Sequence, residues 1–338
     1  MSDNQIKTLP TIDFDILGRY RQHESRVVIS AGVTPLIIEK VEVVMKQNRI
    51  QRLNKRFLLQ SLALILLTGA SGTAVPFDDK ITVETLIAKH LETIGPTEAR
   101  AAVKSRIVSG TAVSTIRVGG AGQLAGRAVL ASTGNKSLIG MTFSDIKYSN
   151  ETMAFDGKTV TVGQFNPGTH TPLGQFLLSF DMVFKQGLLG GTLSSAWPLL
   201  DLRVTNPKLK YAGVKKLNGQ QVCVVNYYPR DTSFLGITLF FDSGTFQHVR
   251  TEYEKVINAG MVSQNEVSAR QQETRYKLIE EFSDFKKEGG LSLPHAYKLQ
   301  LSIGSQRGSL LQDWAFTLTQ FAFNETLDDQ QFILTKKP

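Results

Sequence analysis

The side chains that could perform chemistry are spread widely along the chain. The chain contains five histidines: His23, His90, His170, His248 and His295. No two of them stand at the i, i+4 spacing with which histidines on one helix bind zinc. Cys223 is the single cysteine, which excludes an intramolecular disulfide and a zinc site built from several thiolates. The sequence therefore predicts no metal site and no cofactor.

No nucleophile with an accompanying base can be recognised. The Gly-x-Ser-x-Gly motif is absent, and Cys223 lies inside the apolar stretch 221–225, where a cysteine is more often a packing residue. The glycines of residues 119–126 miss the spacing of a phosphate-binding loop and are typical of a hairpin. The acidic pairs Glu280-Glu281 and Asp328-Asp329 are interpreted as solvated carboxylates. We expect no catalytic residue, and a hydrolase without a motif is the least favoured function class.

The charge balance gives little support for nucleic-acid binding. The formal net charge is +8, and about half of this excess lies in residues 1–74. The rest of the chain contains no cluster of Lys and Arg interleaved with aromatic residues, which nucleic-acid binding would require. We therefore expect no nucleic-acid partner.

Residues 45–74 have the pattern of an export signal. Five basic residues precede an apolar run of 14 residues at 57–70, which is shorter than the roughly 20 residues of a membrane span. Small residues follow at Gly72 and Ala74, so we predict cleavage after Ala74. No cysteine follows the run, so no lipid anchor is expected and the mature chain is predicted to be soluble in the periplasm. The alternative is a buried core helix.

The position of this signal suggests how the chain is divided. Met45 would place the signal at the start of translation, so residues 1–44 are interpreted as an upstream extension from a misassigned start. A genuine cytoplasmic extension is the alternative. Residues 75–338 are then expected to form a single domain.

The elements of this domain are mostly strands. A helix is predicted from Thr82, its N-cap, to Gly95, and a second helix over 97–104. Turn residues include the hairpin pairs Asp156-Gly157 and Asn218-Gly219. Strands are predicted at 106–118, 123–133, 136–146, 150–155, 159–165, 208–216, 220–228, 234–242, 246–256, 273–286, 293–303 and 313–323. This succession predicts a mainly β fold: one curled antiparallel sheet, an incomplete barrel, of roughly 11–12 strands.

Between the two series of strands lies an apolar segment, residues 171–202. Its helical pattern places five residues on one face: Leu173, Phe176, Leu177, Phe180 and Phe184. The opposite side is apolar as well, so such a helix must be covered on most sides. One interpretation is a core helix. The other is a lid or plug over the concave face of the sheet, with these five residues contacting an apolar ligand and Gly187, Gly190 and Gly191 permitting movement.

Five segments follow one another in an order that resembles a known family. They are residues 153–168, 215–230, 237–254, 281–301 and 321–334. Their order resembles the LolA/LolB-like superfamily of outer-membrane lipoprotein-sorting proteins, in a branch of bacterial proteins of unknown role. The resemblance implies an incomplete antiparallel barrel around a helical lid, with an apolar cavity for acyl chains. No position can be matched to the family's lid-clasping arginine.

The function expected from these observations is binding without catalysis. The resemblance implies a carrier for a lipid or for the acyl chains of a lipoprotein, with donor or acceptor proteins at the inner or outer membrane as partners. We expect the carrier to be periplasmic, from its export signal, and monomeric. The alternative is a sensor or scaffold of the cell envelope, which would use the same fold to bind a protein partner.

Overall fold

The computed structural model describes residues 81–119, 122–145, 148–164, 168–230, 235–258, 273–306 and 308–334. The extension 1–44, the signal 45–74 and the cleavage position at Ala74 lie outside the described residues. The proposals about them remain predictions.

Twelve antiparallel strands form a single sheet, as the sequence predicts. In chain order they are β1 (Ser105–Val118), β2 (Gly122–Thr133), β3 (Lys136–Phe143), β4 (Asn150–Phe155), β5 (Val160–Val162), β6 (Lys208–Leu217), β7 (Gln220–Tyr228), β8 (Gly236–Asp242), β9 (His248–Ile257), β10 (Thr274–Glu288), β11 (Leu291–Ser305) and β12 (Gly308–Phe323). The largest differences from the prediction are that β12 begins earlier, at Gly308, and that β5 is shorter, ending at Val162.

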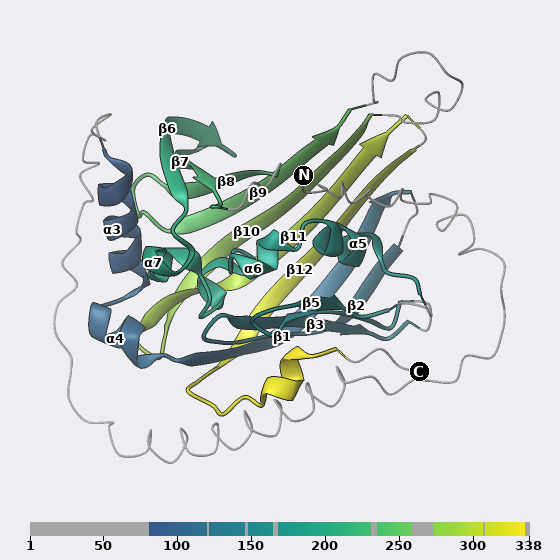
Figure 1. The fold of residues 1–338 in the computed structure, drawn as a ribbon, viewed down its shortest axis with the longest axis horizontal. Helices are drawn as coiled ribbons and strands as arrows, with labels where there is room; N and C mark the ends of the chain where they lie inside the picture. The colour runs from purple at the N-terminus through teal and green to yellow at the C-terminus, as the bar shows by residue number, and fades with distance from the viewer. Residues whose placement is uncertain are drawn as a thin grey trace, which may run out of the picture.

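The sheet consists of two meanders joined through their ends. β1 to β5 form one and β6 to β12 the other, and β1 pairs with β12 to give the order β5-β4-β3-β2-β1-β12-β11-β10-β9-β8-β7-β6 (Figure 1). β5 and β6 do not pair with each other, so the sheet curls without closing. The predicted Asn218-Gly219 hairpin is confirmed, with φ of 48° and 90° as a type I′ turn requires.

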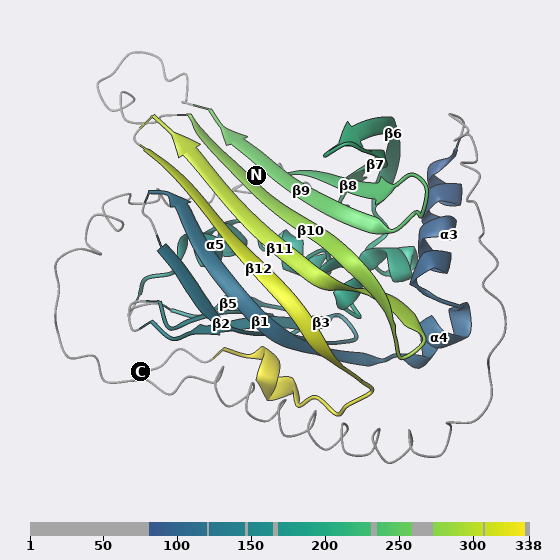
Figure 2. The same ribbon diagram turned by 180° about the vertical axis from the view of Figure 1, so that it is seen from behind.

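The two faces of the sheet carry different side chains because neighbouring residues of a strand point to opposite sides. On β10, Leu278 and Phe282 belong to the main core on the concave face. Glu281 and Lys277 point the other way and join a ladder of ion pairs, in which Arg250 lies 2.8 Å from Glu281 and Lys277 lies 2.8 Å from Glu252. These ion pairs join β9 and β10 on the convex face of the sheet. Figure 2 views the sheet from this side.

A short C-terminal segment covers another part of the convex face. Its 3₁₀ helix η4 (Asp329–Phe332) packs below β1 and β3 (Figure 1). Phe332 is 1% exposed and lies in a small apolar cluster with Ile107, Val129 and Leu138. The acidic closing residues Asp328 and Asp329 have local roles, because Asp328 caps η4 and Asp329 pairs with Lys136.

In the described part of the chain, helices α3 and α4 precede the sheet. In α3 (Val83–Ile94), Thr82 is the N-cap and accepts a hydrogen bond from Thr85 N, as predicted. Its apolar face packs against one end of the concave core (Figure 1). α4 (Thr97–Ala102) ends two residues before the predicted end at 104.

The chain between the edge strands β5 and β6 crosses the concave face, and we call residues 171–200 the crossing segment (Figure 1). It contains α5 (Pro172–Ser179), α6 (Met182–Lys185), η1 (Gly191–Leu193) and η2 (Pro198–Leu200), and α7 (Leu202–Thr205) follows it. The prediction of one continuous helix through Phe184 is wrong, because Phe180 leaves helical geometry with φ −124° and ψ 50°. The break allows apolar side chains that would lie all round one helix to pack on one curved sheet.

Candidate ligand-binding site

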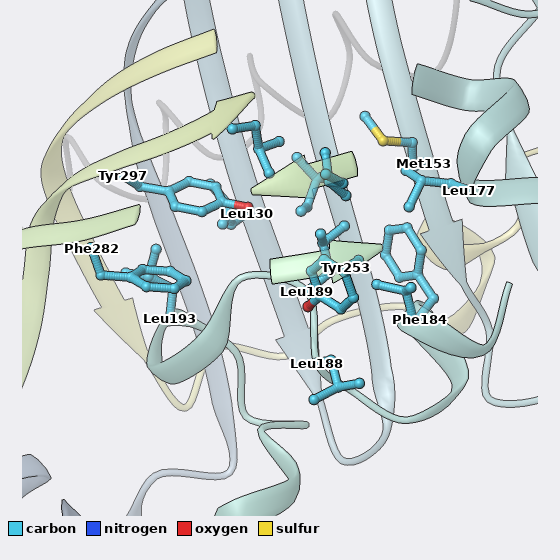
Figure 3. Close-up of a cluster of buried hydrophobic side chains, with 14 of the residues drawn as sticks. Leu130, Met153, Leu177, Phe184, Leu188, Leu189, Leu193, Tyr253, Phe282 and Tyr297 are labelled. Carbon is cyan, nitrogen blue, oxygen red and sulfur yellow. The ribbon is translucent and has the colours of Figure 1, made fainter. Parts of the chain in front are cut away.

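The five residues predicted to face the concavity all contact the main core. Leu173, Phe176, Leu177 and Phe184 are at most 1% exposed, whereas Phe180 is half-buried. The rings of Phe176 and Phe180 adjoin at 4.8 Å, and Phe180 also packs against Tyr276 of β10 at 6.0 Å. Phe184 does not continue this row, since it belongs to α6 and lies with Leu177 and Met153 (Figure 3).

The second half of the crossing segment packs against the stacked rings of Phe282, Tyr297 and Phe316 on β10, β11 and β12, which we call the aromatic floor. Leu188, Leu189 and Leu193 are buried among side chains from both meanders of the sheet (Figure 3). On the floor, Tyr297 of β11 stacks on Phe282 at 5.2 Å and on Phe316 at 5.0 Å. The leucines of the segment therefore fill the space above these rings.

A buried carboxyl group holds the start of the crossing segment. Glu151 of β4 accepts hydrogen bonds from the hydroxyls of Thr171 and Tyr148. Thr171 in turn caps α5 by accepting from Gly174 N at 3.0 Å. Burial raises the pKa of Glu151 to about 7, although these hydrogen bonds favour the ionised form.

A second buried carboxyl group holds the middle of the segment. Glu280 of β10 is fully buried and accepts from Gly190 N, from the Tyr253 hydroxyl and from the Tyr297 hydroxyl, each at 2.7 Å. Burial raises the pKa of Glu280 to about 7, against the opposite effect of its three donors. The interpretation of Glu280-Glu281 as a solvated pair is therefore wrong for Glu280, since one residue of the pair faces inward.

An arginine holds the next turn of the crossing segment. Arg106 of β1 is 1% exposed and donates to the carbonyl oxygens of Thr192 and Ser194, the latter at 3.2 Å. Burial lowers the pKa of Arg106 to about 10. Sequence reasoning assigned no such residue. The pattern that could have found it is a basic residue at an inward position, two residues before Val108 of the concave core.

A pair of buried histidines holds the end of the crossing segment. Trp197 Nε1 donates to Nε2 of His90 at 3.3 Å, and Trp197 stacks on His248 with ring centroids 4.7 Å apart. Burial lowers the pKa of His90 to about 4 and holds the pKa of His248 well below its usual value. The two histidines are far apart in sequence, which is why spacing alone did not connect them.

The glycines of the segment have a conformational role. Gly187 and Gly191 adopt φ of 68° and 49°, which other residues rarely do. A Cβ at Gly187 would lie 2.0 Å from the carbonyl oxygen of Ala196, and one at Gly191 would lie 2.9 Å from the Phe282 ring. These glycines are therefore required for the tight path of the segment, whether or not it moves.

The single cysteine has a packing role in the structure. Cys223 of β7 is fully buried, and burial raises the pKa of its thiol to about 11, so the thiolate is disfavoured. Within the described ranges, no group of three or more His, Cys, Asp or Glu residues is placed to hold a metal ion. No helix in the described part of the chain is both long and apolar enough to cross a membrane.

Comparison with solved structures gives distant matches. The chain is similar to LolA superfamily proteins. One from Nitrosomonas europaea has 13% identity and a TM-score of 0.41, with 75% of this chain and 98% of that chain covered. An outer membrane lipoprotein-sorting protein domain from Vibrio parahaemolyticus has 11% identity and a TM-score of 0.35, with 73% and 97% covered. The MucA/MucB complex of Pseudomonas aeruginosa has 10% identity and a TM-score of 0.20, with 71% and 99% covered.

No protein-family model and no curated protein sequence matches the chain.

Proposed function

We propose that this protein is a non-catalytic periplasmic carrier that binds an apolar ligand, the acyl chain of a lipid or lipoprotein, between the crossing segment and the concave face of the sheet. One observation carries the proposal. An apolar segment spans the two unpaired edges of an open sheet and lies on its apolar face, held there by a few buried polar contacts.

A ligand can replace part of the crossing segment when the free energy gained by burying its apolar chain exceeds the cost of separating the polar contacts. An acyl chain gains about 0.8 kcal/mol for each methylene group removed from water. A ligand that replaces Leu188, Leu189 and Leu193 on the aromatic floor recovers the contacts that these side chains give up. The cost is the separation of the polar contacts at Glu280 and Arg106, each of which costs about 1–3 kcal/mol if the buried group is left without a partner.

The unpaired edge at β6 bears on the alternative, a sensor or scaffold that binds a protein. β6 exposes Lys208, Lys210, Lys215 and Lys216. Lysines on an edge strand oppose the addition of a partner strand. Strand addition at this edge is therefore disfavoured, which supports the carrier proposal over this form of the alternative.

Native mass spectrometry of protein purified from its own cell envelope tests the proposal. We expect lipid to remain bound, and the lipid-free protein to bind the uncharged probe N-phenyl-1-naphthylamine saturably, with displacement by acyl compounds. Lipid-free protein in a tight complex with another protein, together with no saturable probe binding, would favour the sensor or scaffold.

A further inference from the structure

Glu280 is a buried carboxyl group whose three hydrogen-bond partners are all uncharged. All three are donors: the Gly190 amide and the hydroxyls of Tyr253 and Tyr297. No cation is seen to pair with Glu280 among the residues that the structure describes, although a buried carboxylate normally has such a partner. Two other buried charged residues lie under the crossing segment. Arg106 donates to Ser194 of the segment, and Glu151 accepts from Thr171 of the segment.

The three donors belong to different parts of the fold. Tyr253 and Tyr297 lie on β9 and β11, on either side of β10, and are fixed by strand pairing to Leu278 and Phe282. Gly190 lies on the crossing segment. If the segment moves off the floor, Oε1 of Glu280 loses the Gly190 donor, while both tyrosines remain. An acceptor then faces the space in which an acyl chain would lie.

Apart from the Arg106 guanidinium, which donates to Thr192 and Ser194 of the segment, the described groups around this acceptor are apolar or neutral. His248 is adjacent, since its Nδ1 lies 3.1 Å from the position of a Cβ at Gly191, but burial holds its pKa well below the usual value and keeps it uncharged. Two apolar core residues lie beside Glu280: Leu299, its partner on β11, and Phe282, two residues along β10. In such surroundings a vacant acceptor costs free energy, and a ligand donor that replaces Gly190 N removes that cost.

We propose that Glu280 selects ligands whose acyl or alkyl chain carries an N–H or O–H donor at its polar end, an amide, hydroxyl or ammonium group, and rejects free carboxylates. This inference rests on the proposed function, because it requires the ligand to lie on the concave face. The donor takes the place of the Gly190 amide at Glu280. A carboxylate brings a second negative charge and no donor, so both its charge and its hydrogen-bonding capacity are unsuited to this position.

Three ten-carbon compounds test the selectivity: decylamine, decanamide and decanoate. Each is titrated against N-phenyl-1-naphthylamine bound to the full chain at about pH 8.5, where Glu280 is ionised and the amine is charged. We expect the wild-type protein to bind decylamine most tightly and decanoate at least about tenfold more weakly, a difference of about 1.4 kcal/mol. In Glu280→Gln the difference between amine and carboxylate should fall below about threefold, while decanamide still binds.

Glu281→Gln is the matched control, because Glu281 lies next in sequence on the convex face and pairs with Arg250. It should keep the wild-type order of affinities. Equal displacement by all three compounds in the wild-type protein would overturn the role of Glu280 and leave the carrier proposal standing. An unchanged preference in Glu280→Gln would do the same. If no compound displaces the probe and the probe itself does not bind saturably, both proposals fail.

Discussion

Trp197 donates its indole N–H to Nε2 of His90 over 3.3 Å, and this bond attaches the end of the crossing segment to helix α3. The other ring nitrogen, Nδ1, lies 3.1 Å from the carbonyl oxygen of Phe246. A neutral ring with its proton on Nδ1 satisfies both bonds, in agreement with the lowered pKa of His90. The segment is therefore fixed at this end by a neutral, buried contact.

The first prediction concerns this contact. Trp197→Phe removes the indole N–H and leaves Nε2 of the buried His90 without its donor. We expect the free energy of unfolding to fall by about 1–3 kcal/mol, measured by urea denaturation. Removing both partners in Trp197→Phe/His90→Phe should cost less than the sum of the single changes. Strict additivity in this cycle would show that the bond contributes nothing to stability.

The second prediction concerns pH and Glu280. Its folded-state pKa of about 7 lies above the ordinary value of 4.5, so the folded protein binds the proton more tightly than the unfolded chain. The resulting stabilisation is complete below pH 4.5 and is lost as the pH rises through 7. It amounts to about 3 kcal/mol, from about 1.36 kcal/mol for each pKa unit.

The comparison of wild-type protein with Glu280→Gln isolates this effect. Glu151 titrates over the same range and His90 over an acidic one, but both are present in each protein and cancel in the difference. We expect the variant to gain stability relative to wild type by up to about 3 kcal/mol between pH 4.5 and 8, measured by denaturant unfolding. A difference that does not vary with pH would show that Glu280 titrates normally.

Much of the fold was predictable because strands and hairpins depend on local patterns. The alternation of apolar and polar residues, and turn pairs such as Asn218-Gly219, can be recognised from a few consecutive residues. All twelve strands were predicted in this way. The burial of Leu173, Phe176, Leu177 and Phe184 was predicted from helical spacing as well, but the break at Phe180 was not. Both halves of the segment pack on the curved sheet, and the sequence of the segment alone does not contain this curvature.

The polar contacts of the site were not predictable, because they join residues far apart in sequence. Glu280 contacts Gly190, and Arg106 contacts Thr192, across separations of 90 and 86 residues. In the sequence Glu280 stands beside Glu281 and resembles an ordinary solvated pair. Only the alternation of β10, with Leu278 and Phe282 inward, indicates that Glu280 faces the core.

The third prediction concerns export. The basic run, the short apolar core and the small residues at Gly72 and Ala74 predict that the mature protein begins at Val75. N-terminal sequencing of protein recovered from the periplasm should therefore start at Val75. A mature protein that retains residues 1–44 would contradict both the cleavage position and the interpretation of Met45 as the start.

The fourth prediction concerns Cys223. Its side chain is fully buried on β7, and burial raises the pKa of the thiol to about 11. We expect the folded protein to resist modification by a thiol reagent until it is unfolded. Cys223→Ala should lose about 1 kcal/mol of stability and keep its probe affinity. A variant that folds normally but no longer binds the probe would give the thiol a functional role.

The fifth prediction separates packing from ligand binding in the crossing segment. Phe176 is 1% exposed in the core, so Phe176→Ala should cost about 3–5 kcal/mol of stability. Phe180 is only half-buried, at the end of α5 and against Tyr276, so Phe180→Ala should cost clearly less. If α5 contacts the ligand, Phe180→Ala should nevertheless alter the affinity for N-phenyl-1-naphthylamine.

Both variants are compared by melting temperature and probe titration on the same preparations, with Tyr276→Phe as a conservative control that keeps the ring beside Phe180. A purely structural α5 predicts that affinity changes only when stability does, because loss of binding would then reflect loss of folded protein. A contact with the ligand predicts the reverse for Phe180→Ala: a small change in melting temperature and a large change in affinity. A Phe180→Ala protein with wild-type affinity would exclude this end of α5 from the binding site.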